Sequence, residues 1–281
     1  MKKNKKNRSI ASYPYIFWSG LFIVIPLLIV LFFSLTEVTE NGYVFTLNNY
    51  TRLFRSQYIK IFYRSIKLAL ISTIGCLVLG YPVAYIISKI DEKKRNLLIM
   101  LFVLPMWMNF LLRTYAWMPI LGKTGIVNNF LSHFGISPIG FLYNDGAVLL
   151  GMIYNFLPFM VLPIYTVLNK MDQSYIQAAS DLGANKQYIF RKVIFPLSLP
   201  GVMSGITMVF MPAVSTFVIS SLLGGGQYML LGNLIEQEFT TMGNRNLGSA
   251  ISVIMMIVIL ISMAIMNKFS DDDKEGSTGL W

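Results

Sequence analysis

The sequence predicts an all-α polytopic membrane protein with six transmembrane helices, and three observations carry this prediction. Of 281 residues, 55% are hydrophobic and only 13% are charged, whereas a soluble domain carries about 25% charged residues. The mean hydropathy is +0.60. Six apolar runs approach the roughly 20 residues that a helix needs to cross a bilayer: 15–36, 66–88, 97–119, 147–168, 200–221 and 249–267. Such a composition excludes a cytosolic enzyme or a nucleic-acid-binding domain.

The first apolar run follows a basic tail, residues 1–14, and so shares one feature with a secretory signal peptide. Its apolar stretch is longer than the usual signal core, and no small-residue cleavage site follows it. We therefore expect residues 15–64 to form an uncleaved first span and an outer loop. Residues 65–268 should form a core of five further helices, and the polar segment 269–281 a disordered cytoplasmic tail.

Orientation in the cell membrane follows from the distribution of Lys and Arg, because cytoplasmic loops carry an excess of both. With both termini inside, 15 of the 23 basic residues lie in the N-terminal tail, loop 89–96, loop 169–196 and the C-terminal tail. The remaining eight include a cluster at 52–67, which we expect to be an amphipathic outer approach to the second span. The bias favours cytoplasmic termini.

The loop between the fourth and fifth spans predicts two short helices joined by a glycine turn. Ser174 and Gln177 have the spacing of a capping box, which indicates a helix over 175–182. Gly183 is placed for the left-handed position after that helix. Asn185 is a typical cap for a second helix over 186–194, and Pro196 is expected to end it.

This hairpin is too apolar for an ordinary solvated loop. Ala178 and Ala179 are small enough for another surface to approach closely, and the second helix carries five apolar residues: Tyr188, Ile189, Phe190, Val193 and Ile194. An exposed apolar hairpin is typical of a protein-binding surface. A hairpin that only packs beneath its own bundle fits the pattern equally well.

The same segment resembles the coupling loop of the permease family of type I binding-protein-dependent ABC importers. That loop has a Glu-Ala-Ala motif, a Gly four residues later and a Pro near its end. Here Gln177, Ala178 and Ala179, then Gly183 and Pro196, match it, with Gln in place of Glu. The resemblance covers nearly the whole chain and is greatest to permeases of spermidine/putrescine importers. It is carried by 45–53, 76–82, 157–163, 179–184 and 230–235.

The resemblance implies a type I permease fold and a function divided among several proteins. This chain would form half of a pathway with a homologous second permease, and an external polyamine-binding protein would deliver substrate. ATP and Mg would act in two partner ATPases, with no catalytic residue, bound cofactor or metal on this chain. The residues implied in ATPase coupling are Ser174, Gln177, Ala178, Ala179, Asp181, Gly183, Ala184 and Pro196.

A polyamine pathway requires carboxylates and aromatic faces, because ammonium groups are attracted to both. Outer-side carboxylates that border spans are Asp145, Glu236 and Glu238; solvated loop charges or docking of the binding protein explain them as well. Polar and aromatic candidates at membrane depth are Trp107, Asn109, Tyr115, Tyr154 and Asn155. Bundle packing or an interfacial aromatic belt is the simpler interpretation of this second set.

Other functions remain open at this stage. An ABC importer for another small solute would share the hairpin. An autonomous channel or secondary transporter would leave the hairpin without a role, and a membrane-embedded enzyme would need acid–base or metal groups. The six predicted spans contain no Asp, Glu or His, which argues against ion coupling through membrane carboxylates and against hydrolytic chemistry.

Overall fold

The computed structural model describes residues 13–40, 42–226 and 228–278, with side chains up to Met266. The helical, polytopic fold is confirmed. Within the described residues, five helices are long and apolar enough to cross a membrane, and a bent helix pair makes a sixth. The five are Tyr13–Ser34, Ser56–Lys89, Asp145–Lys170, Lys186–Ser215 and Arg245–Met266.

The predicted tails fall mostly outside this description. Residues 1–12 of the N-terminal tail lie outside the described residues. The backbone of the last helix continues to Thr278, into the segment 269–281 for which the sequence predicts disorder. The side chains of that segment lie outside the described part of the chain, and its disorder stays a prediction.

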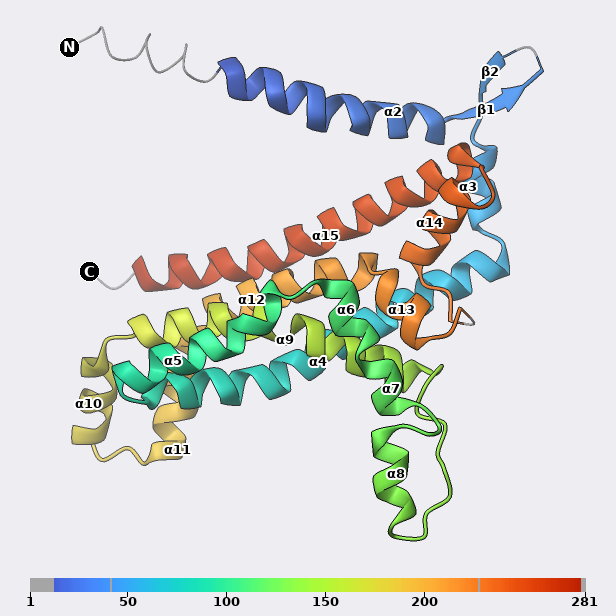
Figure 1. Cartoon of the computed structure of the whole chain (residues 1–281). Helices are drawn as coiled ribbons and strands as arrows, with labels where there is room; N and C mark the ends of the chain where they lie inside the picture. The colour runs from blue at the N-terminus through green and yellow to red at the C-terminus, as the bar shows by residue number, and fades with distance from the viewer. Residues whose placement is uncertain (1–12, 41, 227, 279–281) are drawn as a thin grey trace, which may run out of the picture. The chain divides into compact units, whose positions relative to one another are not determined.

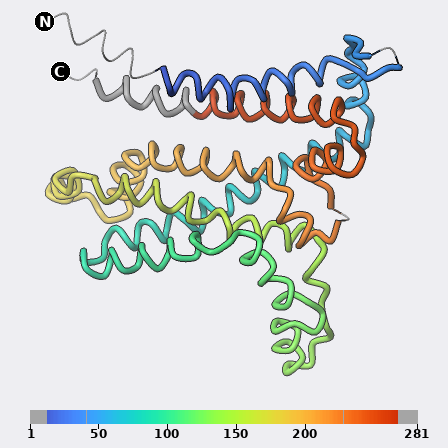
Figure 2. The backbone as a smooth tube through the Cα atoms, turned by 45° about the horizontal axis from the view of Figure 1, so that its top comes forward, coloured from blue at the N-terminus to red at the C-terminus, as the bar shows by residue number. Residues whose placement is uncertain are grey.

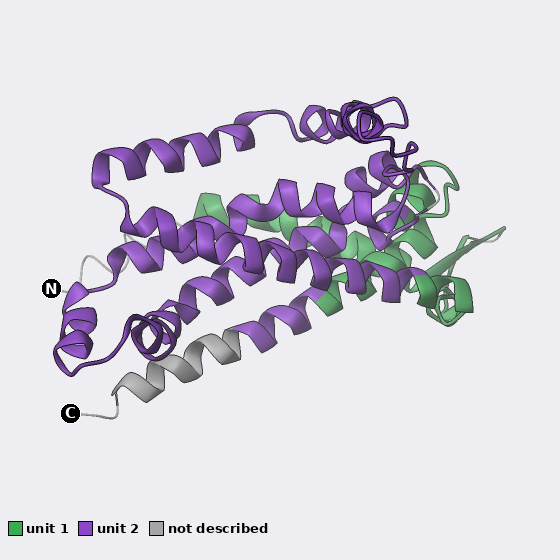
Figure 3. Ribbon diagram, turned by 90° about the horizontal axis from the view of Figure 1, so that it is seen from below, with its two compact units in different colours: residues 1–60, 234–258 green, residues 61–233, 259–281 purple. Residues whose placement is uncertain are grey.

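The chain divides into two compact units, coloured separately in Figure 3. The first consists of Met1–Lys60 and Leu234–Val258, and the second of Ile61–Asn233 and Ile259–Trp281. Each unit therefore combines segments that are far apart in the sequence. The predicted sequence divisions after residues 14, 64 and 268 stay predictions.

The first unit contains a β-hairpin that the sequence analysis did not predict. After a π-helical turn, η1 (Gly20–Val24), and α2 (Ile25–Ser34), strands β1 (Thr36–Thr39) and β2 (Gly42–Phe45) pair antiparallel, and α3 (Asn48–Leu53) follows. The amides of Asn49 and Asn246 donate to the Thr36 carbonyl at 2.9 and 2.7 Å. The hairpin is short and largely exposed, so no apolar alternation marks it in the sequence.

The remaining helices lie mostly in the second unit, but residues 56–60, 234–240 and 245–258 of three of them belong to the first unit. In chain order they are α4 (Ser56–Lys89), α5 (Glu92–Val103), η2 (Leu104–Trp107), α6 (Phe110–Tyr115), α7 (Trp117–Leu121), α8 (Ile126–Ser132), α9 (Asp145–Lys170), α10 (Gln173–Asp181), α11 (Lys186–Ile189), η3 (Phe190–Ile194), α12 (Phe195–Ser215), α13 (Val218–Leu223), α14 (Leu231–Thr240) and α15 (Arg245–Thr278).

Close packing of α9 against α12 forms the core of the second unit. Gly201 and Gly205 of α12 face α9, and a β-carbon at Gly205 would lie 2.7 Å from the Met160 sulfur. A β-carbon at Gly201 would lie 2.9 Å from the Pro163 carbonyl oxygen. These two glycines have the GxxxG spacing, which allows two helix backbones to approach closely.

The third predicted span, 97–119, is present as a bent pair of helices rather than as one continuous helix. Helix α5 and the 3₁₀ turn η2 end at Trp107, and the chain turns by 97° before the following helical segment. Met108 and Asn109 are extended, with ψ values of 149° and 129°. Apolar residues continue on both sides of the break, so hydropathy alone gives no sign of it.

The fifth predicted span, 200–221, is also interrupted. Helix α12 ends at Ser215, Thr216 is extended, and α13 begins at Val218. The Asn233 amide donates to the Phe217 carbonyl at 2.9 Å, and its oxygen accepts from the Leu230 N–H at 3.2 Å. A side chain from α14 thus satisfies backbone that the break leaves unpaired.

Helices α10 and α11 lie at one end of the second unit, and α8 lies at the opposite end (Figures 1 and 2). Helices α9 and α12 connect the two ends, and α10 and α11 occupy the chain between them. The predicted helical hairpin and α8 therefore lie at opposite ends of the unit, as the single span α9 between them requires.

We predict that Gly201→Ala destabilises the protein, because the new methyl group meets the backbone of α9 at Pro163 and Ile164 as well as the Val167 side chain, and the backbone cannot move aside. The expected loss is about 1–3 kcal/mol, measured as a lower thermal unfolding midpoint in detergent. Gly20→Ala is the matched control, since nothing lies within 4 Å of its β-carbon position. An unchanged midpoint for Gly201→Ala would contradict the close packing.

Candidate functional site

The first helix of the hairpin begins differently from the prediction. Its N-cap is Asp172, whose carboxylate accepts a hydrogen bond from the Ser174 N–H at 2.9 Å. Ser174 is therefore inside α10 and does not form the predicted capping box with Gln177. Hydrogen bonds from Ser174 lower the pKa of Asp172. Both Asp and Ser are good N-caps, and the structure selects the residue nearer the end of α9.

The glycine turn that ends α10 is confirmed. Gly183 has φ of +80°, a conformation that residues with a β-carbon rarely adopt. Its N–H donates to the Ser180 carbonyl at 2.9 Å, and the Ala184 N–H donates to the Ala179 carbonyl at 3.1 Å. This pair of bonds is a Schellman motif, which reverses the chain while satisfying the last helical carbonyls.

The second helix of the hairpin is longer than predicted. Asn185 caps it as expected, and its side chain accepts from the Tyr188 N–H at 2.8 Å. Pro196, however, does not end the helix. A π-helical turn at Phe190–Ile194 precedes it, and the helix continues into α12 as one span, Lys186–Ser215. The wider π turn accommodates the proline ring, which lacks an N–H and would crowd a regular preceding turn.

Aromatic contacts attach the base of the hairpin to α4. The ring of Phe190 lies 5.8 Å from that of Tyr81 and 5.5 Å from that of Tyr85, in edge-to-face geometry. Tyr81 also contacts Phe195 at 5.7 Å, and its hydroxyl lies 2.8 Å from that of Ser198. Because such contacts have a preferred geometry, the second helix of the hairpin is held at a defined position on α4.

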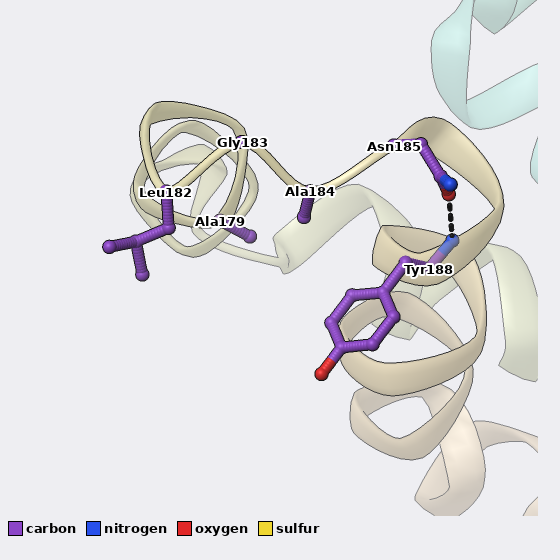
Figure 4. A pocket seen from close by; sticks show the side chains of 6 residues that line it. All are labelled: Ala179, Leu182, Gly183, Ala184, Asn185 and Tyr188. Carbon is purple, nitrogen blue, oxygen red and sulfur yellow. Dashed lines mark hydrogen bonds between the residues drawn. The ribbon is translucent and has the colours of Figure 1, made fainter.

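A hollow of about 440 Å³ lies on the free side of the hairpin. Figure 4 shows its lining side chains around the glycine turn: Ala179, Leu182, Gly183, Ala184, Asn185 and Tyr188. Leu182 is 88% exposed and Tyr188 is 56% exposed, whereas Ile189 and Ile194 are buried. Both interpretations of the apolar hairpin therefore hold, each for different residues. Ile189 and Ile194 pack on the helix bundle, whereas Leu182 and Tyr188 form an exposed apolar surface.

The residues predicted for ATPase coupling fall mainly on this exposed side. Ser174, Gln177, Ala178 and Asp181 are exposed on α10, and Ala179 and Ala184 are half-buried. Pro196 lies beyond the turn, in α12. Sequence reasoning missed Asp172 and Leu182. The position of Asp172 just after the fourth span could have indicated a helix N-cap. Nothing in the sequence around Leu182, which precedes Gly183, indicates that its side chain is exposed.

At the break in the third span, side chains satisfy both helix ends. The Asn109 side chain accepts from the N–H groups of Leu111 and Leu112, at 2.8 and 3.4 Å, and so caps α6. Arg113 is buried and donates to the Pro105 carbonyl at 3.1 Å. A cation at a helix C-terminus and an amide oxygen at an N-terminus are both favourable there. Asn109 and Arg113 therefore stabilise the bend.

Two of the predicted pathway residues meet this bend from α9. The ring of Tyr154 lies 5.4 Å from that of Trp117 and 6.0 Å from the Arg113 guanidinium. The Asn155 amide donates to the Thr114 hydroxyl at 3.3 Å, and its oxygen is buried with no hydrogen-bond partner among the described residues. The remaining two candidates, Trp107 and Tyr115, have exposed side chains.

The candidate carboxylates have different surroundings. Asp145 accepts from Arg64 at 2.6 Å, and the Arg64 guanidinium also lies 4.1 Å from the Tyr228 ring centroid. This ion pair offsets the charge of Asp145. In the first unit, Glu236 is exposed, whereas Glu238 is 8% exposed and burial raises its pKa. No Lys or Arg of the described residues lies within 4.0 Å of Glu238, so its charge is unpaired there.

Comparison with known proteins finds a match along most of the chain. Residues 76–275 match the family model described as binding-protein-dependent transport system inner membrane component. The chain is 42% identical over 249 residues to the spermidine/putrescine transport system permease protein PotB of Haemophilus influenzae, covering 87% of each chain. It is 37% identical over 253 residues to the PotB of Escherichia coli, covering 88% of this chain and 92% of the relative.

Solved structures share the fold. A bacterial ABC transporter involved in importing the acidic polysaccharide alginate matches with a TM-score of 0.82 at 15% identity, over 96% of both chains. The inward-facing methionine ABC transporter MetNI matches with a TM-score of 0.57 at 17% identity, over 76% of this chain and 95% of the other.

We predict that Asp172→Ala speeds amide exchange in the first turn of α10 by about fivefold, because an N-cap hydrogen bond is lost. Hydrogen–deuterium exchange of the peptide covering 171–181 measures this. Asp181→Ala, at the opposite end of the same helix, is the matched control and should not increase exchange there. Equal effects from the two variants would contradict the capping role of Asp172.

Proposed function

The chain belongs to the family of binding-protein-dependent transport system inner membrane components, and on that premise we propose that it forms half of the pathway of an ATP-driven polyamine importer. A homologous second permease forms the other half. Two ATPase subunits bind ATP and Mg, and an external binding protein delivers spermidine or putrescine. This subunit binds neither nucleotide nor metal and moves its substrate by alternating access.

The observation that carries this proposal is the geometry of the hairpin. Its free side presents a hollow around Gly183 with Leu182 and Tyr188 exposed, while its base is attached to α4 through Phe190. When an ATPase surface binds the exposed side of the hairpin and moves, the base of the hairpin at Phe190 moves with it. Small side chains at Ala178 and Ala179 permit close approach, and Gln177 and Asp181 offer polar contacts beside them.

Coupling follows from the connections of the hairpin. The first helix follows α9 directly, and the second continues into α12 without interruption. Because α9 and α12 pack through Gly201 and Gly205, a displacement of the hairpin moves both helices as one body. Nucleotide-driven closure of the ATPases would then change which side of the membrane the pathway opens to.

Both termini and the hairpin are proposed to be cytoplasmic. The excess of Lys and Arg in the N-terminal tail, loop 89–96 and loop 169–196 supports this orientation. The hairpin and α8 lie at opposite ends of the second unit (Figure 1), which is consistent with an inner hairpin and an outer α8. ATP is cytoplasmic, so only this orientation lets the hairpin meet an ATPase.

The polyamine assignment is supported by relatives that are named for spermidine/putrescine transport and match at 36–42% identity. Within the chain, Glu238 offers a buried carboxylate without a cation partner among the described residues. A substrate ammonium would offset the burial that raises its pKa. Trp107 and Tyr115 offer exposed ring faces, and Tyr154 and Asn155 offer polar groups beside the bend. Glu236 adds an exposed charge at the outer side, whereas the charge of Asp145 is offset by Arg64.

We predict that the co-purified complex in lipid, supplied with its binding protein, hydrolyses ATP faster with spermidine or putrescine than without substrate. Gly183→Val should abolish that stimulation, because a β-branched residue disfavours positive φ and its bulk interferes with docking. Gly183→Asn is the control, since Asn tolerates the left-handed conformation.

Three outcomes of this assay would change the assignment. Stimulation of ATP hydrolysis by another solute would support an ABC importer but contradict the assignment of polyamines as its substrate. Failure to recruit any ATPase would favour an autonomous channel or secondary transporter. Full stimulation in Gly183→Val would show that the hairpin turn does not couple the subunits.

We predict that Glu236→Gln combined with Glu238→Gln raises the polyamine concentration for half-maximal uptake by roughly tenfold, since each carboxylate removed weakens attraction of a multiply charged cation. Uptake of radiolabelled spermidine into proteoliposomes measures this. Glu40→Gln, an exposed outer carboxylate, is the matched control. Unaltered kinetics in the double variant would exclude both residues from the pathway.

A further inference from the structure

An apolar groove of about 410 Å³ separates the end of α4 from α5. The two helices lie side by side in both backbone views (Figures 1 and 2). Its lining is entirely aliphatic or aromatic: Val83, Ile86 and Ile87 from α4, Ile90 directly after α4, and Leu98, Leu101 and Phe102 from α5. Ile86 and Leu101 remain more than half exposed, so no other part of the described chain fills the groove.

Four cations lie at or near the connection between α4 and α5, beside this groove: Lys89, Lys93, Lys94 and Arg95. Asp91 and Glu92 accompany them, so the segment 89–95 has a net charge of +2. Neither carboxylate pairs with them, since no acidic group in the described part of the chain lies within 4.0 Å of any of the four. The Arg95 Nε is buried and has no acceptor among the described residues.

Two of the cations, Lys94 and Arg95, lie on the helix face that lines the groove, and Lys93 is next to them. Lys94 precedes Leu98 by four residues and Leu101 by seven, and Arg95 precedes Leu98 by three and Phe102 by seven. Residues at these spacings lie on the same side of a helix. On α4, Lys89 is next to Ile90 and lies 5.6 Å from the Tyr85 ring centroid. The apolar groove thus lies beside a cluster of cations that have no acidic partner among the described residues.

We propose that this groove binds one anionic phospholipid, with an acyl chain between α4 and α5 and the headgroup phosphate on Lys93, Lys94 and Arg95. The apolar lining fits a hydrocarbon chain, and the unpaired cations fit a phosphate. The proposal rests on the proposed cytoplasmic placement of loop 89–96 and is independent of the transported solute. In that orientation, the cations lie at the headgroup level of the inner leaflet, where a basic cluster attracts anionic lipid.

Charge complementarity favours this occupant over the partner permease. A packed protein helix would cover the apolar lining and would still need carboxylates for four cations. A zwitterionic lipid would fill the groove with no net charge to offset them. An anionic lipid satisfies the apolar and the charged parts of the site together, because its phosphate offers an acceptor to cations that have no acidic partner among the described residues.

Native mass spectrometry of the whole importer complex in detergent tests this site without depending on transport or orientation. The complex is titrated with dioleoyl phosphatidylglycerol or dioleoyl phosphatidylcholine, and lipid retained on this subunit is measured after gas-phase release. We expect the wild-type subunit to retain phosphatidylglycerol at a lipid concentration roughly tenfold lower than the concentration at which it retains phosphatidylcholine.

Two variants should remove that preference: Lys93→Gln/Lys94→Gln/Arg95→Gln, which removes the charge, and Ile86→Trp, which fills the groove. Lys2→Gln/Lys3→Gln/Lys5→Gln removes three cations elsewhere and should retain the preference. If the triple variant assembles poorly, the double variant Lys93→Gln/Lys94→Gln, which changes only exposed side chains, replaces it in the test.

Loss of the preference in both groove variants, with retention in the control, supports the site. Loss only when cations are removed would indicate diffuse surface attraction and overturn a groove site. No preference in the wild type would also overturn the proposal and indicate that another subunit covers the groove. Displacement by millimolar glycerol 3-phosphate would show that the cations bind a free phosphate rather than a lipid.

Discussion

The packing of α9 on α12 is the contact on which the rest of the second unit depends. Gly201 and Gly205 bring the two helix backbones close enough that even one methyl group would meet the Pro163 carbonyl or the Met160 side chain. The hairpin lies in the chain between these two helices, so their packing determines where it emerges. Its base contacts Tyr81 and Tyr85 of α4 as well. The hairpin is thus connected to the bundle at three helices.

Hydrogen bonds from side chains to the free backbone groups explain why the two interrupted spans are stable. Hydrocarbon offers no hydrogen bonds, so a broken span persists only where side chains replace the missing backbone bonds. Asn109 and Arg113 do so at the bend after Trp107, and Asn233 does so after Ser215. Arg113 is therefore compatible with a pathway for cations, because its charge is directed at a helix C-terminus and at neighbouring rings.

Some of the site was predictable because it depends on local chemistry. Gly183 and Asn185 act through their own backbone conformation and nearest turn, and both have the predicted roles. The cap at Ser174 and the helix end at Pro196 were wrong because each had a local competitor. Asp172 offers an equally good cap closer to α9, and a π turn removes the clash that makes proline a helix breaker. The exposure of Leu182 and the burial of Glu238 had no local signal.

By itself, the sequence determined the membrane class, the approximate position of each apolar run and the turn of the hairpin. These properties follow from hydropathy and from residues whose conformation is restricted. Only the tertiary structure decided where spans break, which apolar residues of the hairpin face outward, and which carboxylates are paired. The physical reason is that hydropathy measures the preference of a residue for an apolar environment. Whether lipid, a neighbouring helix or a partner supplies that environment depends on contacts between residues far apart in the chain.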